Sequence, residues 1–427
     1  MEHHNRTIAA WCLYDWANSA FTTLVVTFVY STYFTKAIAP DPATGTLLWS
    51  RGIGISAVLV ALLSPLLGSL ADHSGRRKRS LLIATMVCVA ATALLTFVRP
   101  DGPNAIALAL TLFVVANIAY ELGIVFYNAF LPDLAPASKI GAISGYGWGL
   151  GYAGGIVCMA VGLVCLVTPQ PLLGISTELG FNIRATNLLV ACWFLIFNLP
   201  LLLRLRDQPP PEPRNRTGSP MANFRQTWYD LRTYPEVIKF LIARLLYNDG
   251  LVTVFAFGGI YAATTFGMGM REVMLFGIVI NIAAGVGALC FGFVDDAIGG
   301  KRTIRISIIA LFLATGLAVV APDKTWFWTA AVLIGLFVGP NQSASRSLMG
   351  RFVPPRHQAE FYGFFSFSGK ISSFLGPILL GIVTARFQSQ RAGVATVLIF
   401  FVVGGLLLET VNEQRGIAAA ANPPDPV

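Results

Sequence analysis

The residues of this chain best suited to chemistry are charged and amide side chains inside long apolar segments. A charge at bilayer depth costs about 2.5 to 3.5 kcal/mol, so it must face protein or a water-filled cavity. A carboxyl group held there could carry a proton or bind an ammonium group. The best single candidate is Glu121, which stands well inside the apolar run 104 to 130. The alternative for such a charge is a static ion pair that holds two helices together.

Two stretches in the first half of the chain each place acidic and amide groups on one helical face. Asp15 and Asn18 stand three residues apart near the start of the chain. Asn117 and Glu121 are four residues apart, and Asn128 follows seven residues later. Residues at these spacings share one side of an α-helix. We therefore expect two polar faces turned inward, although Asp15 has the alternative role of a cap at its helix start.

The second half carries cations inside apolar runs. Arg244 and Lys370 could each pair with a carboxylate of the protein or with an acid group of a substrate. Asp249 shares a run with Arg244, and the sequence around it echoes that around Asp15. The full set of candidate substrate or coupling residues is Asp15, Asn18, Asn117, Glu121, Asn128, Arg244, Asn248, Asp249, Asn341, Gln342 and Lys370.

The elements that must position these side chains are apolar segments. The chain of 427 residues is 55% hydrophobic and only 12% charged, with a mean hydropathy of +0.67, which is typical of a membrane protein. A run of about 18 residues crosses a hydrocarbon core about 30 Å thick. The sequence predicts twelve such spans, at 12 to 35, 51 to 71, 80 to 98, 104 to 130, 140 to 167, 186 to 203, 238 to 262, 272 to 294, 303 to 321, 325 to 347, 361 to 384 and 392 to 409.

These spans predict an all-α membrane protein with two pseudo-symmetric bundles of six helices. The first bundle comprises residues 1 to 204, and the second comprises 238 to 427 with a short tail. A linker rich in proline and arginine, residues 205 to 237, joins them. Most of the 30 lysines and arginines fall in the loops on one side, so both termini should face the cytoplasm. The net charge of +9 is thus a topology signal, which disfavours nucleic-acid binding.

One loop between the second and third predicted spans has a repeated form. It reads Gly68-x-Leu-Ala-Asp72-x-x-Gly75-Arg76-Arg-Lys, and a weaker copy at 292 to 302 contains Asp296. The glycines allow tight turns, while Asp72 could bind a helix N-terminus or pair with Arg76. Arg346, at the end of the tenth span, is the candidate for a gate or a lipid-headgroup contact. The repeat indicates a duplicated six-helix unit.

The first copy resembles the signature loop of the major facilitator superfamily. Three further motifs, Tyr14 to Phe21, Phe126 to Ala135 and Ala359 to Gly363, are similar to those of its vacuole-effluxer-like family. This resemblance implies an alternating-access transporter, and its fungal members imply amino-acid efflux by analogy. The chain departs from the family pattern where Asn341 and Gln342 follow Pro340.

The function predicted is secondary or facilitative transport of small organic solutes such as amino acids, with protons as a possible coupling ion. Sugars or drug-like cations are alternative substrates, and a non-transporting receptor on the same fold is an alternative class. An enzyme is disfavoured because the four histidines, His3, His4, His73 and His357, all lie outside the spans. We expect no cofactor and no metal, a monomer, and a location in a prokaryotic plasma membrane.

Overall fold

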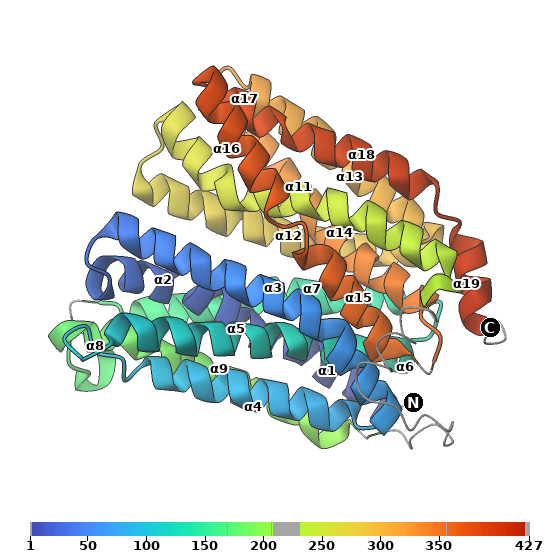
Figure 1. The fold of residues 1–427 in the computed structure, drawn as a ribbon, viewed down its shortest axis with the longest axis horizontal. Coiled ribbons are helices and arrows are strands. Elements are labelled where there is room, and N and C mark those ends of the chain that lie inside the picture. The colour runs from blue at the N-terminus through green and yellow to red at the C-terminus, as the bar shows by residue number, and fades with distance from the viewer. Residues whose placement is uncertain (1, 169, 206, 208–230, 356, 423–427) are drawn as a thin grey trace. The chain divides into compact units, whose positions relative to one another are not determined.

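The computed structural model describes residues 2–168, 170–205, 207, 231–355 and 357–422. Within these residues all regular structure is helical, as Figure 1 shows. Residues 208–230, most of the predicted linker, lie outside the described part. The boundaries of the two predicted bundles therefore stay a prediction.

Ten helical stretches of the described part are long and apolar enough to cross a membrane. They are formed by α3 (Pro42–Ser74), α4 (Arg77–Leu95), α5 (Ala105–Ala129) with α6 (Leu131–Leu134), α7 (Ile140–Cys165), α8 (Phe181–Arg184) with α9 (Thr186–Arg204), α11 (Pro235–Phe266), α12 (Met270–Ile298), α13 (Gly300–Val320), α15 (Gln358–Lys370) with α16 (Leu375–Phe387), and α17 (Gln390–Ala395) with α18 (Val397–Glu409). Each overlaps one of the predicted spans. Two short 3-10 turns, η3 (Leu172–Gly174) and η4 (Glu178–Gly180), precede α8.

The first and tenth predicted spans are also helical, but they are richer in polar residues. The first consists of α1 (Glu2–Ala20), η1 (Phe21–Phe28), α2 (Tyr30–Tyr33) and η2 (Phe34–Ile38), where η1 and η2 are π-helical. The tenth is α14 (Lys324–Phe352), which begins where Asp323 accepts hydrogen bonds from the N–H groups of Thr325 and Trp326. The chain ends in a short helix, α19 (Glu413–Ala421).

The first predicted span changes from α-helix to π-helix at Phe21. The hydroxyl groups of Thr22 and Thr23 both donate to the carbonyl oxygen of Ser19, at 3.1 and 2.8 Å. π-Helical turns are rare and occur often at functional sites. This irregular stretch directly follows the polar face that contains Asp15 and Asn18.

Close contacts divide the chain into two units. The first unit consists of residues 1–63, 74–127 and 150–210, as far as they are described. In it α9 packs against α1 and α4. Trp11 of α1 and Tyr127 of α5 each donate to the other's backbone carbonyl oxygen at 3.1 Å, and their rings stack at 4.4 Å. This reciprocal pair fixes α1 against the end of α5.

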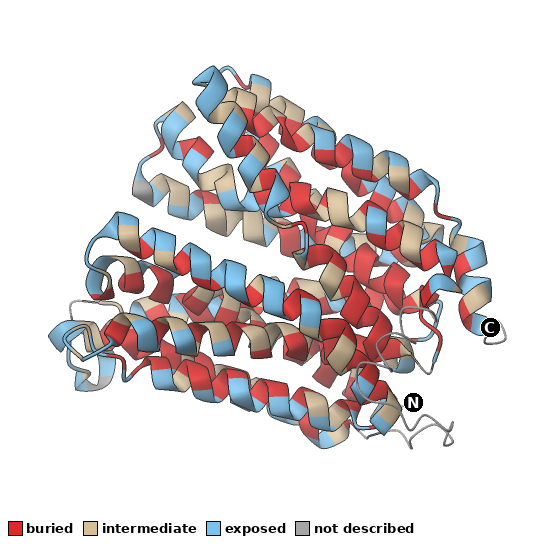
Figure 2. Ribbon diagram, viewed as in Figure 1, coloured by how far each residue is buried: buried red, intermediate tan, exposed pale blue. Residues whose placement is uncertain are grey.

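The second unit consists of residues 64–73 and 128–149 together with the described residues after 211. Here α14 packs against α12 and α13, and α11 packs against α18. Figure 2 shows that α14 and α15 carry many buried residues. Glycines make this packing close, because a Cβ atom at Gly339 of α14 would overlap the carbonyl oxygen of Ala284 in α12.

Candidate functional site

The predicted polar face of α1 forms in the first unit and meets α5. The Asn18 amide donates to the Asp15 carboxylate at 3.3 Å, and the Tyr120 hydroxyl reaches the Asn18 amide oxygen at 3.5 Å. Both Asp15 and Asn18 are buried. Glu121 follows Tyr120 on α5 and is half-buried. The structure therefore places a carboxylate, an amide and a phenol in a row, with a second carboxylate at the next position.

One expectation for this region is corrected. Asp15 does not cap its helix, because α1 begins at Glu2 and residue 15 lies well inside it. Asn128 lies on α5 like Asn117 and Glu121, and it accepts a hydrogen bond from Arg346 at 3.5 Å. Asn117 lies in the first unit, where it donates to the Ser56 hydroxyl of α3 at 2.7 Å.

In the second unit, Arg244 of α11 lies against α15. Its Nη1 donates to the carbonyl oxygen of Phe365 at 2.7 Å and to the Ser368 hydroxyl at 2.9 Å. Its guanidinium lies 3.5 Å from the centre of the Phe365 ring. A Cβ atom at Gly369 would stand 2.8 Å from Nη1, so a larger residue there would displace the guanidinium. The Asn248 amide donates to the Gly369 carbonyl oxygen at 3.2 Å.

Asp249 lies beside a break in the helical path of α15 and α16. The predicted span 361 to 384 is interrupted between Lys370 and Leu375. One Asp249 carboxylate oxygen accepts from the Gly376 N–H at 2.9 Å in the first turn of α16. The other is buried without a hydrogen-bond partner in the described part of the chain. Broken membrane helices are typical of transporter binding sites.

The other candidates of the second half lie on α14 and α15. Asn341 is buried, and both polar atoms of its amide lack a hydrogen-bond partner among the described residues. Gln342 and Lys370 are half-buried. Arg244 and Asp249 bind different partners among the described residues, which agrees with their unfavourable spacing of five.

The signature loop holds the N-terminus of α15. An Asp72 carboxylate oxygen accepts from the Glu360 N–H at 2.9 Å, and Asp72 is buried. A Cβ atom at Gly68 would overlap the Ala359 carbonyl oxygen, and Gly75 has a φ of 64°, which favours glycine. Arg76 is exposed just before α4. Of the two roles predicted for Asp72, the structure shows the contact with a helix N-terminus.

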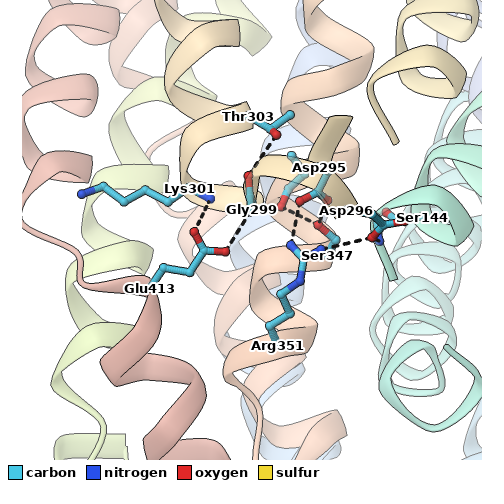
Figure 3. A network of polar contacts seen from close by, with 12 residues as sticks. Ser144, Asp295, Asp296, Gly299, Lys301, Thr303, Ser347, Arg351 and Glu413 are labelled. Atoms are coloured by element: carbon cyan, nitrogen blue, oxygen red, sulfur yellow. Dashed lines mark hydrogen bonds and ion pairs between the residues drawn. The ribbon is translucent and has the colours of Figure 1, made fainter. Parts of the chain in front are cut away.

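The second copy of the loop does the same for α7. The Asp296 carboxylate accepts from the N–H groups of Gly141 and Ala142 at 2.7 and 2.9 Å. Its neighbour Asp295 binds Arg351 Nη1 at 2.6 Å and the Ser347 hydroxyl, as Figure 3 shows. Each copy thus places a carboxylate on the N-terminus of a helix, where the helix dipole favours negative charge.

Arg346 ties α14 to α7. Its Nε donates to the Ser144 hydroxyl at 2.9 Å, and its Nη2 donates to the Ser144 carbonyl oxygen at 2.6 Å. The side chain lies 5.4 Å from the centre of the Trp148 ring. Because Arg346 is 3% exposed, the predicted headgroup contact is wrong, and the residue joins two helices instead.

Some residues of these networks were not among the sequence candidates. They are Ser144, Ser347, Arg351 and Glu413, of which Glu413 accepts from the N–H groups of Gly300 and Lys301. Arg351 and Glu413 stand in or beside loops, where charge is ordinary. One sequence signal points to Arg351. The adjacent carboxylates of Asp295 and Asp296 in the second loop copy need a cation.

The comparisons with known proteins agree with this geometry. The family described as "Vacuole effluxer Atg22 like" matches residues 50–421. An uncharacterized MFS-type transporter, YxiO of Bacillus subtilis, is 29% identical over 97% of this chain and 96% of that protein. Autophagy-related protein 22-1 of Penicillium rubens is 27% identical over 65% of this chain, and the matched stretch spans about half of that fungal protein (50%).

Solved structures share the fold at low sequence identity. The E. coli fucose:proton symporter FucP matches with a TM-score of 0.75 and 12% identity, over 96% of this chain and 98% of that one. The proton:xylose symporter XylE matches with a TM-score of 0.74 and 13% identity, over 97% of each chain. The predicted resemblance and fold class are thereby confirmed. The chain belongs to the Atg22-like vacuole effluxer family, and it is a multi-pass membrane transporter with the twelve-helix major facilitator fold.

Proposed function

We propose that this protein is an alternating-access transporter of small organic solutes, with amino acids as the first class to test. The observation that carries the proposal is the repeated loop, in which Asp72 and Asp296 each accept hydrogen bonds from backbone N–H groups at the N-terminus of another helix. Such contacts can open and re-form without covalent change. Two equivalent contacts therefore suit a protein that closes and opens one side of a central path.

Protons are the proposed coupling ion, and Glu121 is the proposed carrier. It adjoins the row formed by Tyr120, Asn18 and Asp15, which provides polar groups between α5 and α1. A carboxyl group at such a place can take up a proton on one side and release it on the other. Facilitated efflux without protons would need no titrating group, so the two mechanisms differ in their response to a pH gradient.

The test is uptake of a labelled amino-acid panel into proteoliposomes, with and without a pH gradient. Glu121→Gln is expected to abolish the dependence on the gradient while leaving exchange of substrate. Glu178→Gln, at an exposed position of the first unit, is the matched control and should behave as wild type. If no amino acid moves in folded wild-type protein, the proposed substrate class is wrong.

Sugars are the second candidate class, because symporters of fucose and xylose share the fold. Both sugars belong in the same panel, together with a drug-like cation. Uptake of a sugar alone would replace amino acids as the proposed substrate and leave the transport mechanism in place. Ligand binding without movement of any solute would favour a receptor.

The proposed location is a prokaryotic plasma membrane, with both termini in the cytoplasm and a monomer as the working unit. The charge bias of the loops supports this orientation. Single cysteines at exposed Arg76 and exposed Asp101 should react from opposite sides of intact cells with an impermeant reagent. If both introduced cysteines reacted from the same side of the membrane, the proposed orientation would be wrong. If crosslinking produced dimers, the proposed monomeric state would be wrong.

A further inference from the structure

Arg244 carries a positive charge that no acidic side chain balances in the described part of the chain. It lies nine residues, about 14 Å, inside α11, a helix long and apolar enough to cross the membrane. Its partners among the described residues are the neutral Phe365 carbonyl oxygen, the neutral Ser368 hydroxyl and the Phe365 ring. A cation at this depth needs an anionic or strongly polar partner to offset its desolvation. The neutral contacts orient the guanidinium but leave its charge uncompensated.

The contacts of Arg244 also use only part of its donors. Both hydrogen bonds come from Nη1, and none from Nη2 or Nε occurs among the described residues. The side chain is half-buried, so these donors are not sealed inside the protein. A guanidinium binds a carboxylate best through two parallel N–H groups, and Nη2 and Nε form such a pair.

A second arginine of the same unit shows what a purely structural arrangement looks like. Arg391 donates from Nη1 to the Val319 carbonyl oxygen at 2.7 Å and from Nη2 to that of Ala321 at 2.6 Å. It too lies near an aromatic ring, that of Phe266. Both of its terminal nitrogens are therefore occupied by the protein. Arg244 differs because Nη2, one of its two terminal nitrogens, has no hydrogen-bond partner among the residues that the structure describes.

Arg244 packs closely against Gly369, and a second cation is the next residue in the sequence. Gly369 has no side chain, and any Cβ atom there would contact both Nη1 and Nη2. Lys370 follows Gly369 at the end of α15, directly before the break in the helical path. The Asn248 amide is fixed on the Gly369 carbonyl oxygen. The guanidinium of Arg244 is thus held against α15 at the residue that precedes Lys370.

We propose that Arg244 binds the carboxylate of the transported solute, and that substrates of this protein must carry an acid group. The inference rests on the proposed transport function and makes it more specific. Uncharged sugars and drug-like cations would not be bound at this position. Gly369 serves as a positioning residue, because it lets the guanidinium lie against α15.

The test measures thermal stabilisation of the purified full-length protein by ligands. The ligands are L-alanine, L-serine, L-leucine and L-phenylalanine, each compared with its carboxamide, and inorganic phosphate. A ligand that binds only the folded state raises the melting temperature with its concentration. We expect at least one free amino acid to stabilise the protein, while its carboxamide does so only at about tenfold to hundredfold higher concentration.

Variants then locate the effect. Arg244→Gln should raise the concentration needed for half-maximal stabilisation by about tenfold to hundredfold. Arg244→Lys keeps the positive charge but loses the pair of parallel N–H donors. Its concentration for half-maximal stabilisation should lie between those of the wild type and of Arg244→Gln. Arg391→Gln is the matched control, and it should lower the basal melting temperature without changing the dependence on ligand concentration. If Arg244→Gln does not fold, two other measurements test the role of Arg244. They are the concentration dependence of Arg244→Lys and the comparison of each acid with its amide on the wild-type protein.

The inference is overturned if an amide stabilises as well as its acid, if Arg244→Gln leaves the concentration dependence unchanged, or if no ligand of the set stabilises. Stabilisation by inorganic phosphate alone also overturns it, since the site would then take a different anion. Uptake assays on the same preparation separate this result from the proposed function. Binding of an acid without its movement contradicts transport, whereas equal movement of acid and amide contradicts the role of Arg244.

Discussion

The Glu413 carboxylate accepts a hydrogen bond from the Gly300 N–H at 2.8 Å, across 113 positions of the chain, and one from the Lys301 N–H at 3.1 Å. Figure 3 shows this carboxylate pointing at the turn between α12 and α13. That turn needs a glycine at residue 299, which has a φ of 94°. The neighbouring Asn412 N–H donates to Glu236 of α11 at 2.6 Å. The last helix, α19, is thus tied to both α11 and α13.

Removal of this cap is expected to destabilise the protein. Glu413→Ala leaves the first N–H groups of α13 without their acceptor, and the loss of a cap costs about 1 kcal/mol. Glu413→Gln keeps one acceptor oxygen and should cost less. Thermal unfolding in detergent measures whether Glu413→Ala has a lower melting temperature than Glu413→Gln. Gln414→Ala, a change at the exposed neighbouring residue, is the control. A melting temperature of Glu413→Ala equal to that of Gln414→Ala would contradict the capping role.

Two ion pairs of similar length should differ widely in their effect. Arg351 and Asp295 lie 2.6 Å apart with side chains 9% and 1% exposed, whereas Arg99 and Asp101 lie 2.8 Å apart with side chains 59% and 50% exposed. Removal of one partner from a buried pair leaves an uncompensated charge and costs about 3 to 5 kcal/mol. An exposed pair is worth about 0 to 1 kcal/mol.

We therefore expect Arg351→Ala to lower the melting temperature strongly and Arg99→Ala to leave it nearly unchanged. The double variant Arg351→Ala with Asp295→Asn should recover much of the loss, because it removes the buried charge as well. Thermal unfolding of the three variants decides. Equal shifts for Arg351→Ala and Arg99→Ala would mean that Asp295 is not charged and buried as described.

Two glycines in membrane helices should respond oppositely to the same change. A methyl group at Gly339 of α14 would overlap the backbone of α12, while no atom lies within 4 Å of a Cβ atom placed at Gly316 of α13. Overpacking of this kind costs about 1 to 3 kcal/mol. Gly316→Ala should be neutral or slightly stabilising, since alanine favours a helix over glycine by up to about 1 kcal/mol. Melting curves that show no difference would contradict the close approach of α12 and α14.

The helices of this fold could be predicted because apolar length is readable in the sequence. Within the run 361 to 384, the pair Gly376-Pro377 indicates a bend, but the sequence does not show that the side chain of Asp249, far away in the chain, takes the Gly376 N–H at the start of α16. The change to π-helix at Phe21 leaves no apolar signal either. A polar contact between helices marks the first place, and side-chain hydrogen bonds within the first span mark the second.

The site was predictable where its residues are adjacent in the sequence. Asp72 and Gly75 stand at fixed offsets in one loop, so their motif is visible without a structure. Helical spacing groups Asn128 with Asn117 on α5, but it does not reveal that Arg346, 218 positions away, donates to Asn128. Glu413 shows the limit of composition, because a glutamate after the last span looks like an ordinary surface residue until its partner at Gly300 is known.

The two loop carboxylates allow a reciprocal prediction. Asp72 protects the Glu360 N–H of α15, and Asp296 protects those of Gly141 and Ala142 of α7. The first N–H groups of a helix have no partner within it, so their exchange with solvent reports directly on these carboxylates. Asp72→Asn should speed amide exchange in residues 358 to 361 and leave residues 140 to 143 unchanged, and Asp296→Asn should do the reverse. A loss of about 1.4 kcal/mol corresponds to about tenfold faster exchange.

Hydrogen exchange followed by mass spectrometry measures both segments in one sample, so each variant is the control for the other. Faster exchange of both segments in either variant would mean that the two contacts open together, and unchanged exchange in both would mean that the carboxylates do not hold these helix ends.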